Sequence, residues 1–454
     1  MRDGGAVLAH SSRAGTPADW APMDLLIRNA RLRGHSGLLC VGIRKGRIAE
    51  IAPDLPPDGR ETLDAAGHLT TPAFVEPHTH LDKALISDRM PPNVSLSSEE
   101  ARRNLRAEKG RFTVGDVLER AQVVLGWALA AGATAVRTHV DVDTAAGLRG
   151  LEAILALREK MADYADLQVV AMPQHGIFAD PGTEDLLEEA LRMGADVVGG
   201  FPEEELHEEA GRRHIDRVFA LARRFDRPID MHLDIRYSPQ TRYLHYTAWK
   251  TLQEGWNGRV AAGHVSALPY YDPYEAAHVI ETVRRAGMSI TTCPPTTTML
   301  GARLYPEPRG RGITRVKDFL QAGVNIAFAQ DNVLDPFNEN FGDADPLKTG
   351  FLTAYAAQFG SRRDLEVLYD MATENAAKVL ALPDYGMAPG CRADLVITPV
   401  ECVRDAFRLA PPRRFVIRRG RVIARAEVAR WSAWEGGGKP AAPPRRPAPL
   451  SGDP

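Results

Sequence analysis

The sequence predicts an α/β fold, in which a TIM-like (β/α)8 barrel is joined to a small β-sandwich domain formed by both chain ends. Buried-strand and helix-like segments alternate through the middle of the chain, and we count eight strand candidates there. Short strands separated by turns flank this region on both sides. The length of 454 residues and the hydrophobic content of 44% suit a barrel with a large core.

The eight strand candidates are apolar, and segments of helical period such as residues 184–191 lie between them. The candidates are residues 73–80, 135–142, 167–172, 196–200, 228–232, 259–264, 289–293 and 324–329. Strands that alternate with helices favour a parallel sheet, and eight such units favour a closed barrel. We therefore expect the barrel over residues 71–383.

The flanking regions predict one small β domain, made of residues 23–70 together with residues 384–430. Its expected strands are residues 25–28, 38–43, 47–51, 393–397, 414–417 and 420–423, with turn signals such as Lys45-Gly46 between them. Residues 1–22 and the Pro-rich residues 431–454 have no periodicity and are predicted to be disordered tails.

The composition excludes several classes of protein. A net charge of −3 with mixed signs gives no basic stripe for nucleic acid. The sequence has no run of eighteen apolar residues and no secretory h-region, which argues against a membrane partner and against export. The four cysteines are scattered without C-x-x-C spacing, as expected for reduced thiols. We expect a cytoplasmic protein.

The segment His78-Thr79-His80 ends the first barrel strand and predicts the start of a metal site. Alternate residues of a strand point to the same side, so His78 and His80 present two imidazoles together. Neutral imidazoles in such pairs commonly bind zinc, iron or a similar ion. The pair alone is a weak signal, because a short motif needs its structural context.

Further polar residues occupy the C-terminal ends of other predicted strands, where (β/α)8 barrels carry their chemistry. These strand-end residues are His78, His80, His139, Asp141, Gln174, His232, Asp234, His264, Asp331 and Asn332. Buried charged groups are costly unless they are paired or bound to metal, so this repeated placement indicates a metal site. For His139 alone, a core histidine satisfied by protein groups is an equally good interpretation.

The chain resembles the amidohydrolase superfamily, specifically the branch of cytosine deaminase and N-isopropylammelide amidohydrolase. The matching segments are residues 75–82 (VEPHTHLD), 136–142 (VRTHVDV), 173–174 (PQ), 194–199 (GADVVG), 229–232 (IDMH), 311–317 (RGITRVK), 331–336 (DNVLDP) and 385–386 (YG). Asp82-Lys83 and Phe341-Gly342 are similar to the second of these relatives in particular. The resemblance covers residues 23 to about 425.

The resemblance implies that His78, His80, His232 and Asp331 bind one divalent metal ion, zinc first, with iron or manganese as alternatives. His264 then lies beside a hydroxide held by the metal, and Asp331 moves a proton to the leaving nitrogen. Gln174 is expected to hydrogen-bond a substrate carbonyl or ring nitrogen. The fourth strand has no lysine in residues 196–201, so a second metal bridged by carboxylated lysine is not expected.

The sequence departs from cytosine deaminase at two positions. That family has a glutamate three residues after the histidine of strand five, where this chain has Ile235, which cannot move a proton. The Asp-Asp pair of the bacterial enzyme is Asp331-Asn332 here. Both changes argue against cytosine and are shared with the N-isopropylammelide relative.

Four other features bear on the predicted site. Lys83 either contacts the substrate or forms an ion pair with Asp82 or Asp88. Asn332 is expected on the substrate side, and Asp234 is a candidate for the missing acid, although strand alternation turns its side chain away. The run 203–205 (EEE) is interpreted as the solvated start of a helix.

The predicted function is hydrolysis of a C–N bond in a nitrogen heterocycle, such as a pyrimidine or triazine, by deamination, dealkylamination or amide hydrolysis. The alternative within the enzyme class is a deaminase of the cytosine or isocytosine type with a replaced proton shuttle. A third possibility, of another class, is a non-catalytic scaffold that retains metal. The expected partners are a small heterocyclic substrate and further copies of the chain in a homo-oligomer.

Overall fold

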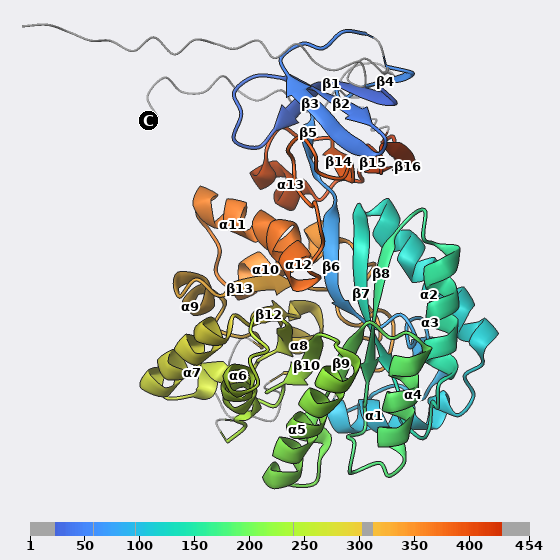
Figure 1. The fold of residues 1–454 in the computed structure, drawn as a ribbon, viewed down its shortest axis with the longest axis vertical. Helices are drawn as coiled ribbons and strands as arrows, with labels where there is room; N and C mark the ends of the chain where they lie inside the picture. The colour runs from blue at the N-terminus through green and yellow to red at the C-terminus, as the bar shows by residue number, and fades with distance from the viewer. Residues whose placement is uncertain (1–22, 58, 96, 239, 302–311, 429–454) are drawn as a thin grey trace, which may run out of the picture.

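The structure, a computed structural model, describes residues 23–428 except residues 58, 96, 239 and 302–311. The tails predicted at 1–22 and 431–454, and the first residue of the motif 311–317, lie outside the described residues. Figure 1 shows a small β domain at one end of the molecule and a larger α/β domain below it.

The larger domain is built on eight parallel strands, in agreement with the predicted barrel. The strands are β6 (Phe74–Thr79), β7 (Ala133–Asp141), β8 (Asp166–Met172), β9 (Val197–Gly200), β10 (Ile229–Leu233), β11 (Val260–His264), β12 (Ser289–Thr292) and β13 (Asn325–Phe328). They are hydrogen-bonded in sequence order from β6 to β13. A parallel bridge between Thr79 and Asp331 brings the two outer strands together, so the barrel is nearly closed.

Helices follow the strands and surround the sheet (Figure 1). They are α1 (Ser98–Lys109), α2 (Val114–Ala130), α3 (Arg149–Lys160), α4 (Thr183–Met193), α5 (Glu208–Phe225), α6 (Tyr243–Gln253), α7 (Pro273–Ala286), α8 (Pro294–Leu300), α9 (Val316–Gln321), α10 (Pro346–Ala356), α11 (Arg362–Ala372), α12 (Glu374–Val379) and α13 (Val403–Leu409). Among the 3₁₀ turns, η3 (Pro202–Glu204) follows β9 at the barrel mouth.

Both chain ends form the small domain, as predicted. Its strands are β1 (Leu25–Leu32), β2 (Leu39–Arg44), β3 (Arg47–Ala52), β4 (Glu61–Asp64), β5 (Leu69–Pro72), β14 (Leu395–Thr398), β15 (Phe415–Arg418) and β16 (Arg421–Arg425). The antiparallel pair β5–β14 joins the two ends, and residues such as Ile27, Val41 and Ile397 share one apolar core.

The sequence did not reveal β4 and β5. The first is short and charged, and the second contains adjacent threonines and ends in proline, so neither has the apolar alternation that marks a strand. Because β5 belongs to the small domain and β6 begins at Phe74, the chain enters the barrel just after the predicted boundary at residue 70.

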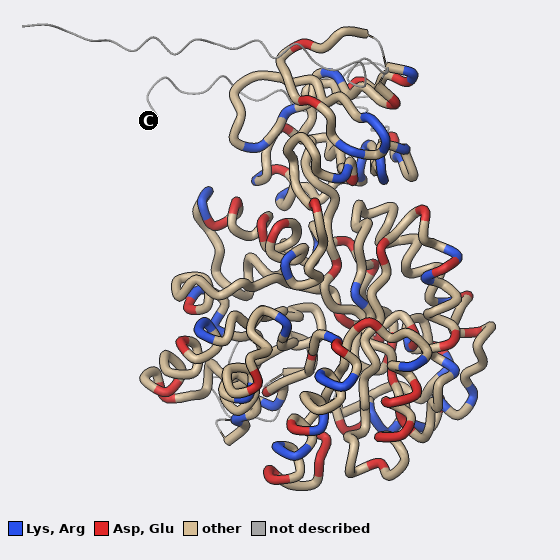
Figure 2. The backbone as a smooth tube through the Cα atoms, in the orientation of Figure 1, with Lys and Arg blue, Asp and Glu red and all other residues tan. Residues whose placement is uncertain are grey.

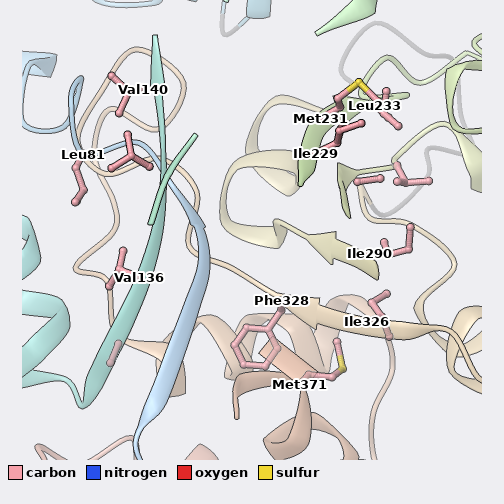
Figure 3. Packing of buried hydrophobic residues seen from close by; sticks show 14 of the residues in the cluster. Leu81, Val136, Val140, Ile229, Met231, Leu233, Ile290, Ile326, Phe328 and Met371 are labelled. Carbon is pink, nitrogen blue, oxygen red and sulfur yellow. The ribbon is translucent and has the colours of Figure 1, made fainter. Parts of the chain in front are cut away.

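The two faces of β10 have different tasks. Ile229, Met231 and Leu233 pack in the apolar core between the sheet and the surrounding helices (Figure 3). The intervening Asp230 and His232 point into the barrel, where they contact Arg137 of β7 and His78 of β6 respectively. The period of two in a strand therefore separates the residues that stabilise the barrel from those that form the site.

Charged residues of both signs are interspersed along the described chain, as Figure 2 shows. All four cysteines are free. Within the described residues, no helix combines the length and apolarity needed to cross a bilayer.

Candidate active site

Five of the predicted residues converge at the C-terminal end of the barrel. His78 lies on β6 and His80 directly follows it, His232 lies on β10, His264 ends β11, and Asp331 follows β13. The Nε2 atom of His80 lies 3.1 Å from Asp331 Oδ1 and 3.3 Å from His232 Nε2. Strands far apart in the sequence thus bring imidazole and carboxylate groups to one point.

Among the described residues, the group of four candidate ligands differs slightly from the ligand set that the resemblance implies. His78, His232, His264 and Asp331 each offer one ligand atom, and these atoms all lie within 4.8 Å of one another. His80 lies beside this group through its contacts with Asp331 and His232, while His264 is part of it. Either histidine can complete the set of ligands, so the geometry leaves the choice between them open.

The buried polar atoms of this cluster fit a divalent cation. Both ring nitrogens of His78 and both carboxylate oxygens of Asp331 are buried without a hydrogen-bond partner among the described residues. Unpaired buried polar groups are costly, and a metal ion removes that cost. His80 places Nδ1 3.0 Å from the backbone oxygen of His139, which leaves Nε2 free toward the cluster, as is usual for metal-binding histidines.

The protonation states also suit a metal site. Burial lowers the pKa of His78 and of His232 well below the usual value, so both imidazoles are neutral at pH 7. Burial alone would raise the pKa of Asp331, but the imidazoles of His264, His78 and His80 hold it below its usual range. Neutral imidazoles and an ionised carboxylate are the forms that bind zinc, iron or manganese.

The backbone at the mouth holds these side chains in place. His264 and Asp331 have φ angles of 70° and 68°, a left-handed conformation that is uncommon outside glycine and concentrates at functional sites. The N–H of Asp331 donates to the carbonyl of His78 at 3.0 Å, and the Thr79 hydroxyl donates to the carbonyl of Asp331 at 2.9 Å. The bonds that close the barrel therefore also position the carboxylate.

Sequence reasoning missed the role of Glu76, whose carboxylate ties β6 to the segment before Asp331. It accepts the N–H of His78 at 3.1 Å and that of Gln330 at 3.1 and 3.2 Å. Burial, followed by the charge of Asp331, raises its pKa to about 8, although the two backbone bonds oppose this. The signal in the sequence was a charged residue inside an otherwise apolar strand.

A pocket adjoins the cluster, and several predicted substrate-binding residues line it, among them Gln174, Lys83 and Asn332. Lys83 Nζ donates to Gln174 Oε1 and to Asp141 Oδ1, both at 2.8 Å. The ion pair of Lys83 is therefore with Asp141, and the predicted pairing with Asp82 or Asp88 was wrong. Gln174 and Lys83 together form a polar wall of the pocket.

Asn332 also lines this pocket. Its amide group donates to Asp335 Oδ2 at 2.5 Å, and its oxygen accepts from the Thr296 hydroxyl at 3.2 Å. These bonds fix the orientation of the amide, so that Asn332 presents a rigid polar surface.

Asp234 does not lie where a substrate-binding residue would. Its carboxylate accepts the N–H groups of Tyr243 and Leu244 at 2.9 and 3.1 Å, and the hydroxyl of Tyr271 at 3.2 Å. It is absent from the residues that line the described pocket. Asp234 instead anchors the start of α6, because a left-handed turn after β10, with φ of 51°, directs its side chain away from the mouth.

The prediction that residues 203–205 are solvated was wrong. Glu203 is 4% exposed and lines the pocket, where its carboxylate accepts the N–H of Ile235 at 2.5 Å and that of Arg236 at 3.0 Å. Glu205 is 8% exposed and binds His214 Nδ1 at 2.7 Å. The signal that could have identified them is their position directly after the fourth barrel strand.

The side chain of His139 is fully buried, yet its ring nitrogens make no hydrogen bond to the described residues. Its ring lies 4.0 Å from that of His78, and its Nε2 atom is 3.7 Å from Asp230 Oδ2. Neither ring nitrogen has a hydrogen-bond partner among the described residues. The interpretation as a satisfied core histidine is therefore wrong.

Comparison with known proteins agrees with this arrangement. The model of the amidohydrolase family matches residues 61–425, which is most of the chain. The chain belongs to the amidohydrolase family. It is an enzyme that acts on C–N bonds other than peptide bonds.

Three similar proteins are all enzymes of nitrogen heterocycles by name. N-isopropylammelide isopropyl amidohydrolase of Pseudomonas sp. (strain ADP) is 30% identical over 89% of this chain and 98% of that protein. Pterin deaminase of Rhizobium rhizogenes is 30% identical over 85% of this chain and 87% of that protein. The structure of 5-methylcytosine deaminase from Klebsiella pneumoniae, liganded with 5-fluorocytosine, superposes with a TM-score of 0.87 at 33% identity, over 90% of this chain and 100% of that one.

Proposed function

We propose that the protein is a mononuclear, metal-dependent hydrolase that cleaves a C–N bond of a nitrogen heterocycle such as a pyrimidine or triazine. The observation that carries this proposal is the cluster of unpaired buried imidazole and carboxylate groups beside a pocket with polar walls. The names of the similar proteins support the substrate class, because ammelide, pterin and 5-methylcytosine are all nitrogen heterocycles.

One divalent ion fits the cluster, and zinc is the ion we propose first. His78, His80, His232 and Asp331 would hold it, with His264 adjacent. Strand β9 (Val197–Gly200) carries no lysine that could bridge a second ion. A bound divalent ion would lower the pKa of a water molecule and so supply a nucleophile at neutral pH.

The residues of the chain then orient the substrate and move protons. Asp331 accepts a proton from the attacking water and gives it to the leaving nitrogen. His264 lies within 3.9 Å of Asp331 Oδ2 and stabilises the charge that develops on the attacked carbon's oxygen. Lys83 and Gln174, joined at 2.8 Å, bind a ring carbonyl or ring nitrogen and fix the plane of the heterocycle.

Deamination of a cytosine-type base is the second candidate. Ile235 argues against it, but the similarity to 5-methylcytosine deaminase and the buried carboxyl group of Glu203 in the pocket favour it. A homo-oligomeric assembly and a cytoplasmic location stay predictions.

The test combines metal analysis with a panel of substrates. The protein would be loaded with zinc and incubated with cytosine, 5-methylcytosine, isocytosine, ammelide and N-isopropylammelide, and products would be identified by mass spectrometry. We expect about one metal ion per chain and release of ammonia or alkylamine from at least one compound. Bound metal without any product from the panel would overturn the proposal and favour a scaffold.

A further inference from the structure

The pocket needs an acid that Ile235 does not provide. Attack on a ring carbon of an aromatic heterocycle moves electrons onto the adjacent ring nitrogen, which must then take a proton. Lys83 donates two of its three N–H groups to Asp141 and Gln174, which leaves one for its contact with another part of the ring. The carboxylate of Asp234 is occupied by the backbone of α6 and by Tyr271. A different group must therefore face this nitrogen.

Glu203 has the position for that task. Its carboxyl group is buried and lines the same pocket as His232, Ile235 and Asp331. The backbone N–H groups of Ile235 and Arg236 hold it at 2.5 and 3.0 Å, one on each oxygen. A carboxyl oxygen has two lone-pair sites, so each oxygen keeps one site, or an O–H, for a ligand.

The strand register explains why this carboxyl group reaches residue 235. Strands β9 and β10 are parallel, and Gly200 pairs with Met231. The segments that follow these two strands are therefore neighbours at the mouth, and η3 (Pro202–Glu204) lies beside residues 234–236. Glu203 thus carries its carboxyl group to the backbone of the residue where the cytosine deaminase pattern has a glutamate.

We propose that Glu203 is the substrate-facing acid of this site and donates a proton to the ring nitrogen next to the attacked carbon. This inference rests on the proposed hydrolysis of a nitrogen heterocycle. The substrate feature that Glu203 would recognise is an amidine edge, in which a ring nitrogen and an exocyclic nitrogen share one carbon.

With Glu203 as the acid, the protons and electron pairs of the proposed reaction balance. As the water oxygen bonds to the carbon, the C=N π electrons move to the ring nitrogen, which takes the Glu203 proton. Asp331 takes one proton of the water and passes it to the exocyclic nitrogen, whose bond to carbon breaks. The remaining hydroxyl proton returns to the Glu203 carboxylate as the carbonyl forms, and ammonia or an amine leaves.

The surroundings of Glu203 keep it protonated at neutral pH. Burial, followed by the nearby charge of Asp234, raises its pKa to about 8, although its two backbone bonds and the Arg236 guanidinium oppose this. That guanidinium is 3.9 Å away, while Arg102 pairs with Glu204 at 3.2 Å. The other titratable groups on adjoining elements are Tyr243 on α6 and Glu208 and His214 on α5, with Glu205 next to it on its own segment.

The decisive experiment compares Glu203→Gln with the double variant Glu203→Gln/Ile235→Glu, using the best substrate of the panel. We expect kcat/KM at pH 7 to fall by about 10²–10⁴-fold in the single variant, with its metal content unchanged. The fall in wild-type kcat/KM above about pH 8 should also disappear, since it reports Glu203 losing its proton. Ile235 lines the pocket, so a glutamate there should raise kcat/KM of the double variant at least tenfold above that of Glu203→Gln.

Glu205→Gln is the matched control, because Glu205 is also a buried carboxylate that holds backbone N–H groups, those of Ile177, Phe178 and Ala179. It does not line the pocket described above. We expect a lower Tm with an unchanged pH profile. Activity of Glu203→Gln within threefold of wild type, or a loss that Ile235→Glu does not repair in a folded, metal-bound protein, would overturn the assignment.

A binding measurement separates this inference from the proposed function. If the zinc-loaded wild type turns over no compound of the panel, calorimetric titration with 5-methylcytosine in buffers of different ionisation enthalpy still counts the protons exchanged on binding. A proton count that changes in Glu203→Gln supports the contact with the ring, while the proposed hydrolysis fails. An unchanged count overturns the contact itself.

Discussion

Replacing Asp331 by asparagine tests the metal site and the proton transfer together. The amide keeps the shape of the side chain but loses the negative charge and the ability to accept a proton. Asp331 is the carboxylate of a tight group whose other members, His78, His232 and His264, are imidazoles with lowered pKa values. The variant therefore leaves a cluster of neutral ligands for a divalent ion.

The size of the effect follows from these two losses. Removing a general acid–base group typically costs about 10²–10⁴-fold in rate, which corresponds to about 2.7–5.4 kcal/mol in the barrier. Weaker metal binding adds to this loss, because even residues that only orient a ligand are worth about 10–100-fold in metal affinity. We expect kcat to fall at least 10³-fold with saturating zinc, and metal content to fall further after dialysis.

The assay measures metal content by mass spectrometry and turnover at fixed free zinc concentration. Asp180→Asn is the control, since Asp180 is also buried, has a lowered pKa and binds the N–H of Thr144 at 2.8 Å and Arg106 at 3.0 Å. It lies outside the pocket lining. Full metal occupancy with kcat within tenfold of wild type in Asp331→Asn would refute the reasoning.

Three further outcomes are expected. Glu76→Gln should weaken metal binding by about 10–100-fold in a competition titration, because Glu76 holds the backbone N–H groups of His78 and Gln330; unchanged affinity would contradict its positioning role. Lys83→Met should raise KM more than it lowers kcat, while Lys109 still neutralises Asp141; an unchanged KM in steady-state assays would remove Lys83 from the substrate contacts. In the metal-free protein, Tm should fall as pH rises from about 4.5 to about 8. Folding raises the pKa of the Glu203 carboxyl group, so this group contributes its full stabilisation below its unfolded pKa and loses it as pH passes its folded pKa. Calorimetry of Glu203→Gln should show a flatter dependence of Tm on pH.

The fold was predictable because the barrel strands are buried on both faces and read as apolar runs. Strand β10 shows why the metal cluster could be predicted as well, since Met231 and Leu233 face the helices while His232, between them, faces the mouth. A pattern of period two carries this information in the sequence itself. Strands β4 and β5 carry no such pattern, because pairing with β1 and β14 rather than apolar alternation defines them.

The errors at the site have a different physical cause. Asp234 and Glu203 are both acidic residues after barrel strands, and local sequence treats them alike. Their tertiary surroundings separate them: a left-handed turn aims Asp234 at the start of α6, whereas η3 folds Glu203 over the end of β10. Hydrogen bonds to backbone N–H groups of later segments, about 10 residues on for Asp234 and more than 30 for Glu203, decide both outcomes. The residues next to each acid carry no signal of these bonds.

A motif ties a chemical role to a spacing along one strand, but a barrel mouth brings the ends of neighbouring strands together. The pairing of Gly200 with Met231 makes the segments that follow β9 and β10 neighbours, so the carboxyl group of Glu203, after β9, can reach the backbone of residue 235. The segment after β10 therefore has Ile235 where cytosine deaminases have a glutamate, but the pocket still contains an acid, Glu203. If Glu203 carries that role, an aliphatic residue at this position does not exclude cytosine-type bases, and the ratio of activities toward 5-methylcytosine and N-isopropylammelide should depend on the walls formed by Lys83 and Asn332.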